Sequence, residues 1–385
     1  MSPPTAVRAR RVPDAAELAD LGRASGLDAV GVTVAEPFTS TRRHLEQRKA
    51  QGLHGGMAFT YRQPARSSDP SRALPDARAL VVGARSYLRT APPAPAPGTD
   101  DGRAVGAVAR YAWTDYYGEL RAALTVVAQR LRDEGWRTRV LADDNALVDR
   151  EAARRAGLGW YGKNANLLLP GQGSWFVLGS IVTDAPLVPA GAGGSDPVPD
   201  GCGSCTRCLD GCPTGAIVEP GVVDARRCLA WLLQMEGPFP REHRAALGDR
   251  IYGCDDCQEV CPPNRRTARH SPPEAGGEVE AEVDLLGMLG STDEELLARH
   301  GRWYVARRQA RYLRRNALVV LGNVGDPGRP EVVEAVRTAL ADDDPLVRGH
   351  AVWAARRMGR ADLVGPDDDD PFVREELAAP VEVRS

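Results

Sequence analysis

Eight cysteines carry the clearest chemical signal in the sequence. They are the only cysteines of the 385-residue chain, and all of them lie between residues 202 and 261. Four follow the spacing C-x2-C-x2-C-x3-C-P, one stands alone, and three follow C-x2-C-x3-C-P; in chain order they are Cys202, Cys205, Cys208, Cys212, Cys228, Cys254, Cys257 and Cys261. Thiolates at such spacings bind iron–sulfur clusters or zinc, and in oxidising surroundings they form disulfides.

The first four cysteines have the spacing of bacterial ferredoxins. In that arrangement three cysteines bind one [4Fe–4S] cluster, and the fourth, before proline, binds the other cluster. The second block has Ile251 where a symmetric ferredoxin has its first cysteine, and we expect Cys228 to take that place. The expected ligands of one cluster are Cys202, Cys205, Cys208 and Cys261, and those of the other are Cys212, Cys228, Cys254 and Cys257.

Two rival uses of the cysteines fit the spacing less well. C-x2-C pairs also bind zinc, but three cysteines at C-x2-C-x2-C followed by C-P do not resemble a zinc ribbon. Disulfides would suit a secreted chain, and we expect no export signal, because no apolar stretch follows Arg8, Arg10 and Arg11. The pattern therefore predicts two [4Fe–4S] clusters and electron transfer, without indicating the electron acceptor.

Length and composition limit the remaining possibilities. A chain of 385 residues suits two or three domains. The formal net charge is −3 at pH 7, so any contact with nucleic acid has to come from a local basic patch. No run of about 18 apolar residues occurs, and we expect no membrane span. Oxygen-sensitive clusters without an export signal predict a cytoplasmic protein.

Helices that alternate with short strands are expected to position the chemistry in the first part of the chain. The expected helices cover residues 14–27, 41–51 and 119–134, and the expected strands cover residues 29–34, 79–84 and 137–141. In the third helix Leu120, Leu124, Val127 and Leu131 recur at helical spacing. This alternation predicts an α/β layer.

A polar segment follows the last of these strands. Asp143 stands at the end of the strand, and Asp143, Asp144 or Asn145 can cap the next helix, which Gly157 is expected to end. Two interpretations of Asp143 stay open on this evidence. It is either a helix cap or a carboxylic acid at a reaction site.

A glycine-rich loop, G-L-G-W-Y-G-K-N, comes next at residues 157–164. It contains neither a P-loop nor a dinucleotide fingerprint. It is either an ordinary surface loop or a backbone that lies against a large polar cofactor, with Lys163, Asn164 and Asn166 as polar contacts. A hairpin of residues 167–169 and 175–182 is expected around P-G-Q-G.

The tail shows a weak internal repeat. R-N-A-L-V-V-L-G-N-V-G-D (315–326) resembles R-G-H-A-V-W-A-A-R-R-M-G (348–359), and D-P-L-V-R (344–348) recurs as D-P-F-V-R (370–374), which predicts HEAT-like helical repeats. Stretches rich in proline and glycine at 185–201 and 262–281 are expected to be linkers.

Arginines interleaved with aromatic residues precede this repeat. They are Arg299, Arg302, Arg307, Arg308, Arg311, Arg314 and Arg315, with Trp303, Tyr304 and Tyr312 among them. A solvated helix face is one interpretation, and a patch that contacts the RNA backbone and stacks on bases is the other. On the second interpretation the expected RNA contacts are Arg307, Arg308, Arg311, Arg314 and Arg315.

Taken together, these motifs resemble the epoxyqueuosine reductases. The resemblance rests on D-x3-L-V-D-R, A-G-L-G-W-Y-G-K-N, G-S-W-F-V-L-G, the two cysteine blocks and the helical repeats, and it runs from about residue 14 to about residue 375. It implies a cobalamin-dependent iron–sulfur enzyme that reduces the epoxide of epoxyqueuosine, at the wobble position (34) of a tRNA, to queuosine. The family is related to the reductive dehalogenases, which also use cobalamin and two clusters.

The resemblance also implies roles for individual residues. Asp143 matches the family's proton donor beside cobalamin, and the cluster that includes Cys228 is implied to lie nearer the cobalamin. The implied cobalamin-binding residues are Arg66, Asp143, Lys163, Asn164, Leu167, Ser174 and Leu178. The D-x-H-x-x-G motif that supplies an axial histidine in many cobalamin enzymes is absent. The chain departs from many members at Asn145 and Ala146, where they carry a small residue and proline.

The expected architecture has three parts. They are an α/β cobalamin-binding domain at 1–190, a ferredoxin-like domain with two [4Fe–4S] clusters at 191–275, and a tRNA-binding HEAT-like repeat at 276–385. The expected partners are an epoxyqueuosine-containing tRNA of the GUN anticodon class and an external single-electron donor, with no membrane, and the chain is expected to be a monomer. An electron carrier would need no acid at a strand end, and a reductive dehalogenase would leave the basic tail unexplained.

Overall fold

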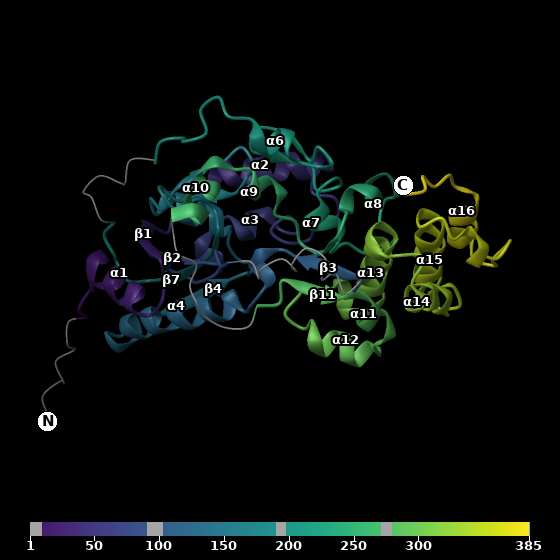
Figure 1. Cartoon of the computed structure of the whole chain (residues 1–385). Helices are drawn as coiled ribbons and strands as arrows, with labels where there is room; N and C mark the ends of the chain where they lie inside the picture. Colours follow the sequence, from purple (N-terminus) through teal and green to yellow (C-terminus); the bar gives the residue numbers. More distant parts are fainter. Residues whose placement is uncertain (1–9, 91–102, 190–197, 271–278, 385) are drawn as a thin grey trace, which may run out of the picture.

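The computed structural model describes residues 10–90, 103–189, 198–270 and 279–384. An α/β layer, a cysteine-rich segment and a helical tail follow one another along the chain, and the tail forms one end of the molecule (Figure 1). Among the described residues, no helix is both long enough and apolar enough to cross a membrane.

A four-stranded sheet forms the centre of the first part. Its order is β1 (Ala29–Val34), β2 (Ala79–Ser86), β7 (Phe176–Thr183) and β4 (Thr138–Ala142), and every neighbouring pair is antiparallel. The two central strands, β2 and β7, are buried along most of their length. Helices cover both faces of the sheet, which explains why these strands are apolar on both sides.

The two faces of the sheet support two separate cores. Helices α1 (Ala15–Ala24) and α4 (Tyr116–Asp133) pack on one face, and α5 (Asp149–Arg155) packs on the other. Successive side chains of a strand point to opposite faces. Val81 therefore belongs to the first core and its neighbour Leu80 to the second.

Helix α4 confirms the prediction made from its apolar spacing. Leu120, Leu124, Val127 and Leu131 are all fully buried against the sheet. Burial of each such side chain contributes about 1.5–3 kcal/mol relative to leaving it exposed. Asp115 caps the helix by accepting a hydrogen bond of 2.9 Å from the Gly118 N–H.

The predicted hairpin forms only at its turn, where Leu169 and Gly173 make an isolated antiparallel bridge. Strand β6 (Leu167–Leu168) pairs with β5 (Trp160–Tyr161), while β7 joins the central sheet. Gly159 makes this possible, because a Cβ at that position would lie 2.0 Å from the Leu168 carbonyl oxygen. The glycine-rich loop therefore folds back onto β6. Short elements α2 (Thr39–Ala50), α3 (Pro64–Ser67), η1 (Pro70–Arg72) and η2 (Arg110–Ala112) complete this part.

The cysteine-rich segment consists of short elements joined by turns. They are α6 (Arg207–Asp210), β8 (Ile217–Glu219), β9 (Val222–Val223), α7 (Leu229–Leu232), α8 (Arg241–Leu247), β10 (Arg250–Tyr252), α9 (Asp256–Glu259) and α10 (Pro262–His270). The second predicted linker is wrong over residues 262–270, because these form α10. The remainder of both linkers falls partly outside the described residues, at 190–197 and 271–278.

A three-stranded sheet joins the three parts of the chain. β3 (Val105–Val108) of the α/β part pairs with β10 of the cysteine-rich segment and with β11 (Glu282–Asp284) of the tail. Ile251 of β10 is fully buried, and a Cβ on Gly106 would lie 2.7 Å from it. The three expected domains therefore share a core, and Ile251 faces that core where a symmetric ferredoxin would have a cysteine.

The tail has the predicted repeat structure. Its elements are α11 (Leu285–Gly290), α12 (Asp293–Arg299), η3 (Ala306–Arg308), α13 (Arg311–Val324), α14 (Pro330–Leu340), α15 (Pro345–Arg357), η4 (Ala361–Leu363) and α16 (Pro371–Ala378). The recurring D-P pair begins α15 and α16 in the same way. Asp344 and Asp370 each accept a 2.8 Å hydrogen bond from a backbone N–H two residues later, and proline follows at the first helical position.

Candidate active site and cysteine centres

The cysteines lie in two groups of four. In the outer set, defined as Cys202, Cys205, Cys208 and Cys261, burial raises the pKa of Cys261 to about 11, and the other three members raise it further. In the inner set, defined as Cys212, Cys228, Cys254 and Cys257, burial raises the pKa of Cys257 well above its usual range, and the other three again add to the rise. The groups match the two ligand sets expected from the sequence.

The thiols suit clusters better than single ions. All eight are free of disulfides, and no three Cys, His, Asp or Glu side chains in the described ranges converge closely enough for one metal ion. A zinc ion with Zn–S bonds of about 2.3 Å would hold its thiolates about 3.8 Å apart, and a four-iron cluster holds them further apart. Eight thiols in two groups of four fit the donor set of two such clusters.

Local structure explains how Cys228 and Cys254 reach the inner set. Cys228 is the N-cap residue of α7, so its side chain stands at the start of a helix instead of inside it. Gly253 precedes Cys254 with φ +75°, and a Cβ there would lie 2.5 Å from the Ala109 Cβ. Only glycine permits this close approach between the cysteine loop and the α/β part.

Asp143 is not a helix cap. Helix α5 begins at Asp149, six residues later, and its N-cap residue Val148 provides no side-chain cap. The neighbours of Asp143 hold the loop: Asp144 accepts a 2.8 Å bond from the Ala146 N–H, and Asn145 accepts a 3.0 Å bond from the Thr60 N–H. Asp143 itself is exposed and adopts φ +54°, in the left-handed region. Such strain at a polar residue is common at functional sites.

A second carboxyl group lies within electrostatic reach of Asp143. Burial raises the pKa of Asp149 well above its usual range, and the charge of Asp143 raises it further. One carboxyl oxygen of Asp149 is buried without a hydrogen-bond partner among the described residues. Desolvation also raises the pKa of Asp143, and the nearby Arg121 guanidinium opposes this rise.

Tyrosines that the sequence analysis missed surround the two carboxyl groups. Desolvation raises the pKa of Tyr117, and the charges of Asp143 and Asp149 raise it further. Desolvation also raises the pKa of Tyr252 to about 12. The Asp143 side chain is exposed, and those of Asp149 and Tyr117 are partly buried. Desolvation is nevertheless the largest cause of the raised pKa at all three residues. Water therefore reaches these groups although protein surrounds them on most sides. The sequence held one signal for these tyrosines: Tyr252 stands two residues before Cys254, a predicted cluster ligand.

The predicted cobalamin-binding residues lie partly in the glycine-rich loop and partly outside it. The Lys163 ammonium donates a 2.6 Å bond to the Gly203 carbonyl oxygen, and the Asn164 amide donates to the Cys257 carbonyl oxygen at 3.3 Å. The glycine-rich loop therefore contacts both cysteine loops. Ser174 is buried and donates to Gln258, Leu167 and Leu178 are buried in the core on the α5 side of the sheet, and Arg66 is exposed on α3.

Family models match three stretches of the chain. A model described as "Epoxyqueuosine reductase QueG, DUF1730" matches residues 67–144, a 4Fe-4S double cluster binding domain matches residues 201–264, and HEAT repeats match residues 303–379. An epoxyqueuosine reductase from Bacillus subtilis is 33% identical over 95% of this chain and 90% of its own length. One from Xanthomonas campestris pv. campestris is 38% identical, over 92% and 99%.

The chain belongs to the epoxyqueuosine reductase family. A solved epoxyqueuosine reductase in complex with an epoxyqueuosine-modified tRNA stem loop is 30% identical, with a TM-score of 0.81 and coverage of 94% of this chain and 98% of the other. A Bacillus subtilis epoxyqueuosine reductase, solved with its catalytic aspartate loop swung out of the active site, is 29% identical at the same TM-score, over 94% and 96%. The family membership confirms the first of the three functions weighed from the sequence.

The double-cluster model and the thiol grouping agree on the iron–sulfur part of an epoxyqueuosine reductase. The matched stretch, residues 201–264, contains all eight cysteines. Two [4Fe–4S] clusters are therefore part of this family member, and the zinc and disulfide alternatives are dropped.

The prediction that Arg315 contacts RNA is wrong. Arg315 is fully buried, and its guanidinium donates to the carbonyl oxygens of Met235 and Gly237 at 2.8 and 2.7 Å. Two of the three aromatic residues expected to stack on bases, Trp303 and Tyr312, are also buried. Arg311 and Arg314 pair with Asp344 and Asp293, so of the five arginines predicted to contact RNA only Arg307 and Arg308 are exposed. Tyr304 is exposed beside them.

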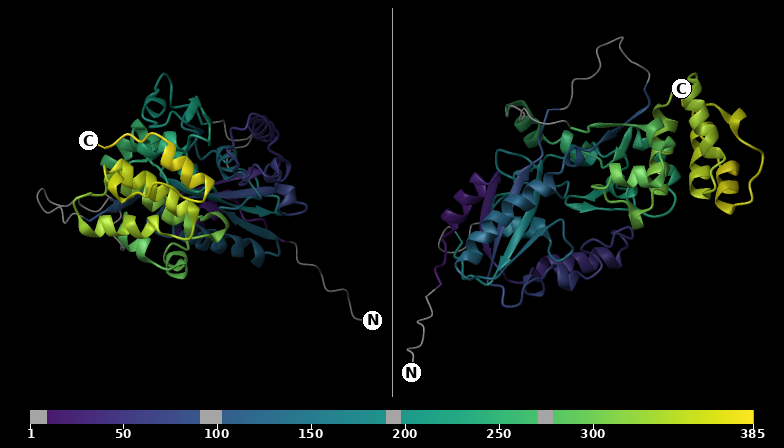
Figure 2. Two further views of the ribbon diagram at one scale, coloured as in Figure 1. Left: turned by 90° about the vertical axis from the view of Figure 1, so that its right-hand side faces the viewer. Right: turned by 90° about the horizontal axis from the view of Figure 1, so that it is seen from below.

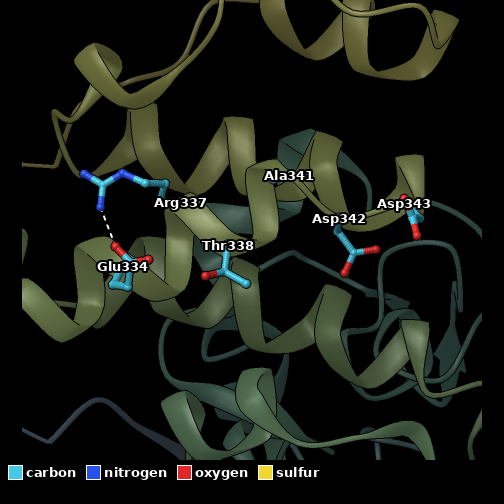
Figure 3. A pocket seen from close by; sticks show the side chains of 6 residues that line it. All are labelled: Glu334, Arg337, Thr338, Ala341, Asp342 and Asp343. Atoms are coloured by element: carbon cyan, nitrogen blue, oxygen red, sulfur yellow. Dashed lines mark hydrogen bonds and ion pairs between the residues drawn. The ribbon is translucent and has the colours of Figure 1, made fainter.

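A shallow hollow on the helical tail is unrelated to this chemistry. It is lined by Glu334, Arg337, Thr338, Ala341, Asp342 and Asp343 on α14 and the turn after it (Figure 3). Arg337 pairs with Glu334, so the hollow is acidic on balance. It lies on the repeat helices, away from the cysteine loops, and its charge does not suit a phosphate backbone.

Proposed function

We propose that this chain reduces the epoxide of epoxyqueuosine in tRNA to queuosine, releasing the oxygen as water. The net change consumes two electrons and two protons. One observation carries the proposal. The carboxyl groups of Asp143 and Asp149, both desolvated and both after β4, lie within electrostatic reach of each other. Asp143 is also within electrostatic reach of Tyr252, which is next to the inner cysteine set. An acid beside an electron source is what reductive cleavage of a carbon–oxygen bond requires.

The electron path is proposed to run from the outer set through the inner set to the substrate. Arg150 supports this order. Burial raises the pKa of Cys228 in the inner set and that of Tyr117 near the carboxyl groups, and the charge of Arg150 opposes both rises. Tyr252, whose pKa the charge of Asp143 raises, stands two residues before Cys254 of the inner set.

Cobalamin is proposed as the cofactor, bound beside Asp143 between the sheet and the inner set. The residues there have the required character, because they are partly accessible groups that protein surrounds, and one Asp149 oxygen is unpartnered among the described residues. The residues that would hold it are Arg66, Asp143, Lys163, Asn164, Leu167, Ser174 and Leu178. When bound, low-valent cobalamin would supply a strong reductant able to engage carbon.

Asp143 is proposed as the proton donor. Its raised pKa keeps the carboxyl group protonated to a higher pH than an ordinary aspartate. It can therefore give its proton to the departing epoxide oxygen, and the unpartnered Asp149 carboxyl group can restore it. The rate should fall as the pH rises through the raised pKa of Asp143, because the deprotonated form has no proton to donate.

The substrate and setting complete the proposal. Exposed Arg307 and Arg308 are proposed to contact the tRNA backbone, with the half-exposed Tyr304 beside them. The substrate is proposed to be a tRNA of the GUN anticodon class modified at position 34, and electrons come from an external single-electron donor. A cytoplasmic monomer is proposed, since both tRNA and reduced clusters are found there.

The test is Asp143→Asn, with Asp144→Asn as its control. Asn keeps the shape but has no proton to donate, so we expect turnover of epoxyqueuosine-tRNA to fall about 10²–10⁴-fold while melting and iron content stay normal. Asp144→Asn should retain its turn and its activity, because an amide oxygen still accepts the Ala146 N–H. The assay is mass spectrometry of tRNA nucleosides after anaerobic reaction with added cobalamin.

An Asp143→Asn protein that turns over near the parent rate would remove Asp143 as the acid and make Asp149→Asn the next test. A parent protein that forms no queuosine under reducing conditions would overturn the proposed function itself.

A further inference from the structure

Helix α10 carries a group of arginines without partners. Arg265, Arg266 and Arg269 are exposed, and none of them forms an ion pair or side-chain hydrogen bond with any described residue. Arg265 and Arg269 are one turn apart, and Arg266 follows Arg265 about 100° around the helix, so the three arginines share one side of the helix.

The opposite side of α10 is firmly anchored. Asn264 is fully buried; it accepts a 2.6 Å bond from the Ser174 N–H and donates a 3.0 Å bond to the Gln258 carbonyl oxygen. Thr267 donates to the Gly171 carbonyl oxygen at 3.3 Å. The helix therefore presents its arginines in a fixed orientation toward solvent.

Helix stability does not explain these arginines. Arg269 lies in the last turn, where the helix dipole favours a cation, but Arg265 and Arg266 lie in the first half, where the dipole opposes one. Like charges one turn apart also destabilise a helix. The cost is small, yet it is not compensated by any contact within the described chain.

The position of the group relative to the outer set points to its role. Helix α10 begins directly after Cys261, and the Arg265 N–H donates to the Cys261 carbonyl oxygen at 2.9 Å. Arg207, between Cys205 and Cys208 in sequence, is also exposed without an ion pair in the described structure. The nearby acids are Asp200 and Asp210, which accept local hydrogen bonds from neutral groups. The four exposed arginines outnumber these two carboxylates, so the rim of the outer set is positive on balance.

We propose that α10 and Arg207 form the docking surface for an acidic protein that delivers electrons one at a time to the outer cluster. The inference rests on the proposed electron path. Each docking moves one electron from the reduced carrier to the oxidised cluster, and the oxidised carrier then leaves. Two dockings supply the two electrons for one epoxide. Opposite charges on the two surfaces accelerate such encounters and orient them.

The alternative partner for a basic surface is the tRNA itself. α10 lies on the side of the cysteine-rich segment away from the helical repeats, both in Figure 1 and in the right-hand view of Figure 2. It also adjoins the outer set instead of the carboxyl groups near the inner set. A surface for RNA would be expected on the side of the carboxyl groups, and these observations favour the electron carrier.

The test measures reduction of the oxidised clusters by a reduced acidic [2Fe–2S] ferredoxin in stopped flow. In the variant Arg265→Glu/Arg266→Glu/Arg269→Glu the second-order rate constant should fall about 10- to 100-fold at low ionic strength, and its salt dependence should flatten. The control Arg11→Glu/Arg23→Glu/Arg337→Glu changes the net charge equally at exposed arginines of ion pairs elsewhere, and it should stay within about threefold of the parent.

Two further measurements separate the explanations. Photoreduced deazariboflavin, a small reductant, should reduce the clusters of the α10 variant and the parent at the same rate, which excludes damage to the clusters. The milder variant Arg265→Gln/Arg266→Gln/Arg269→Gln should give an intermediate rate with ferredoxin. Equal ferredoxin rates in parent and variants would overturn the docking proposal, as would weakened tRNA binding with unchanged ferredoxin rates. Cluster reduction needs no tRNA turnover, so this result stands apart from failure of the proposed reductase activity.

Discussion

Two arginine-rich regions of the molecule differ in how much of their charge is available to a partner. Residues 299–315 contain seven arginines, the densest basic stretch of the sequence. Arg299 and Arg302 pair with Glu280, and the others bind carboxylates or carbonyl oxygens. Helix α10 has three arginines in a stretch expected to be a linker, and none is paired within the described structure. The density of charge along a sequence therefore does not measure the charge that a surface offers.

The difference arises from tertiary contacts that bind the tail to the cysteine-rich segment. Arg315 binds carbonyl oxygens at the end of α7 and after it, and Tyr304 donates its N–H to the Tyr252 hydroxyl at 2.7 Å. Trp303 stacks on Tyr252 with ring centres 4.4 Å apart. Residues 299–315 are thus mainly an internal joint between the tail and the cysteine-rich segment. Helix α10, in contrast, is anchored through the side that carries Asn264 and Thr267.

The largest expected effect distinguishes a joint from a surface. Arg315→Ala should lower the free energy of unfolding by about 3–5 kcal/mol, because it leaves a cavity and several buried carbonyl oxygens without donors. Arg266→Ala on α10 should change it by no more than about 0.5 kcal/mol. Chemical denaturation of both variants under anaerobic conditions measures the contrast. Similar stabilities for the two would contradict the assignment of Arg315 to the joint.

Histidines give a second, pH-dependent contrast. His300 is buried against Trp303 with a ring distance of 4.3 Å, neither of its nitrogens has a partner in the described structure, and burial lowers its pKa to about 4. The unfolded chain binds a proton near pH 6.5 and the folded chain does not, so stability is lost as the pH falls from about 6.5 to about 4. The contribution is up to about 3 kcal/mol.

His300→Phe should flatten this part of the stability profile, because phenylalanine can stack on Trp303 and has no proton to bind. His270→Phe, at the exposed end of α10, is the matched control. Thermal melts of both variants between about pH 4 and pH 7 test the contrast. A His300→Phe profile as steep as the parent's would place the acid sensitivity elsewhere.

The sequence predicted what depends on local spacing. The strand at 29–34, helix α4, the repeat built on Asp-Pro caps and the two sets of cysteines all follow from patterns within a few residues or from a fixed motif. The fate of Arg315 depends on which carbonyl oxygens fold against it from 80 residues away in the chain. The tyrosines around Asp143 come from separate elements, and no single pattern brings them together.

The smallest expected effect tests the part of residues 299–315 that remains available to RNA. Arg307 and Arg308 both adopt left-handed φ angles of +49° and +56°, and such strain in non-glycine residues persists only where surrounding structure maintains it. Arg307 pairs with Glu236 at 2.8 Å on an exposed surface, where an ion pair contributes little and a phosphate can displace the carboxylate.

If both side chains bind phosphates, Arg307→Ala/Arg308→Ala should reduce the slope of log affinity against log salt by about one to two units. Arg311→Ala/Arg314→Ala removes the same charge from side chains paired with Asp344 and Asp293, and its slope should stay near the parent's. Filter binding of an epoxyqueuosine-modified stem loop at several salt concentrations measures all three. Equal slopes for the two double variants would mean that exposure does not distinguish these arginines, and the RNA surface would then have to be sought outside the tail.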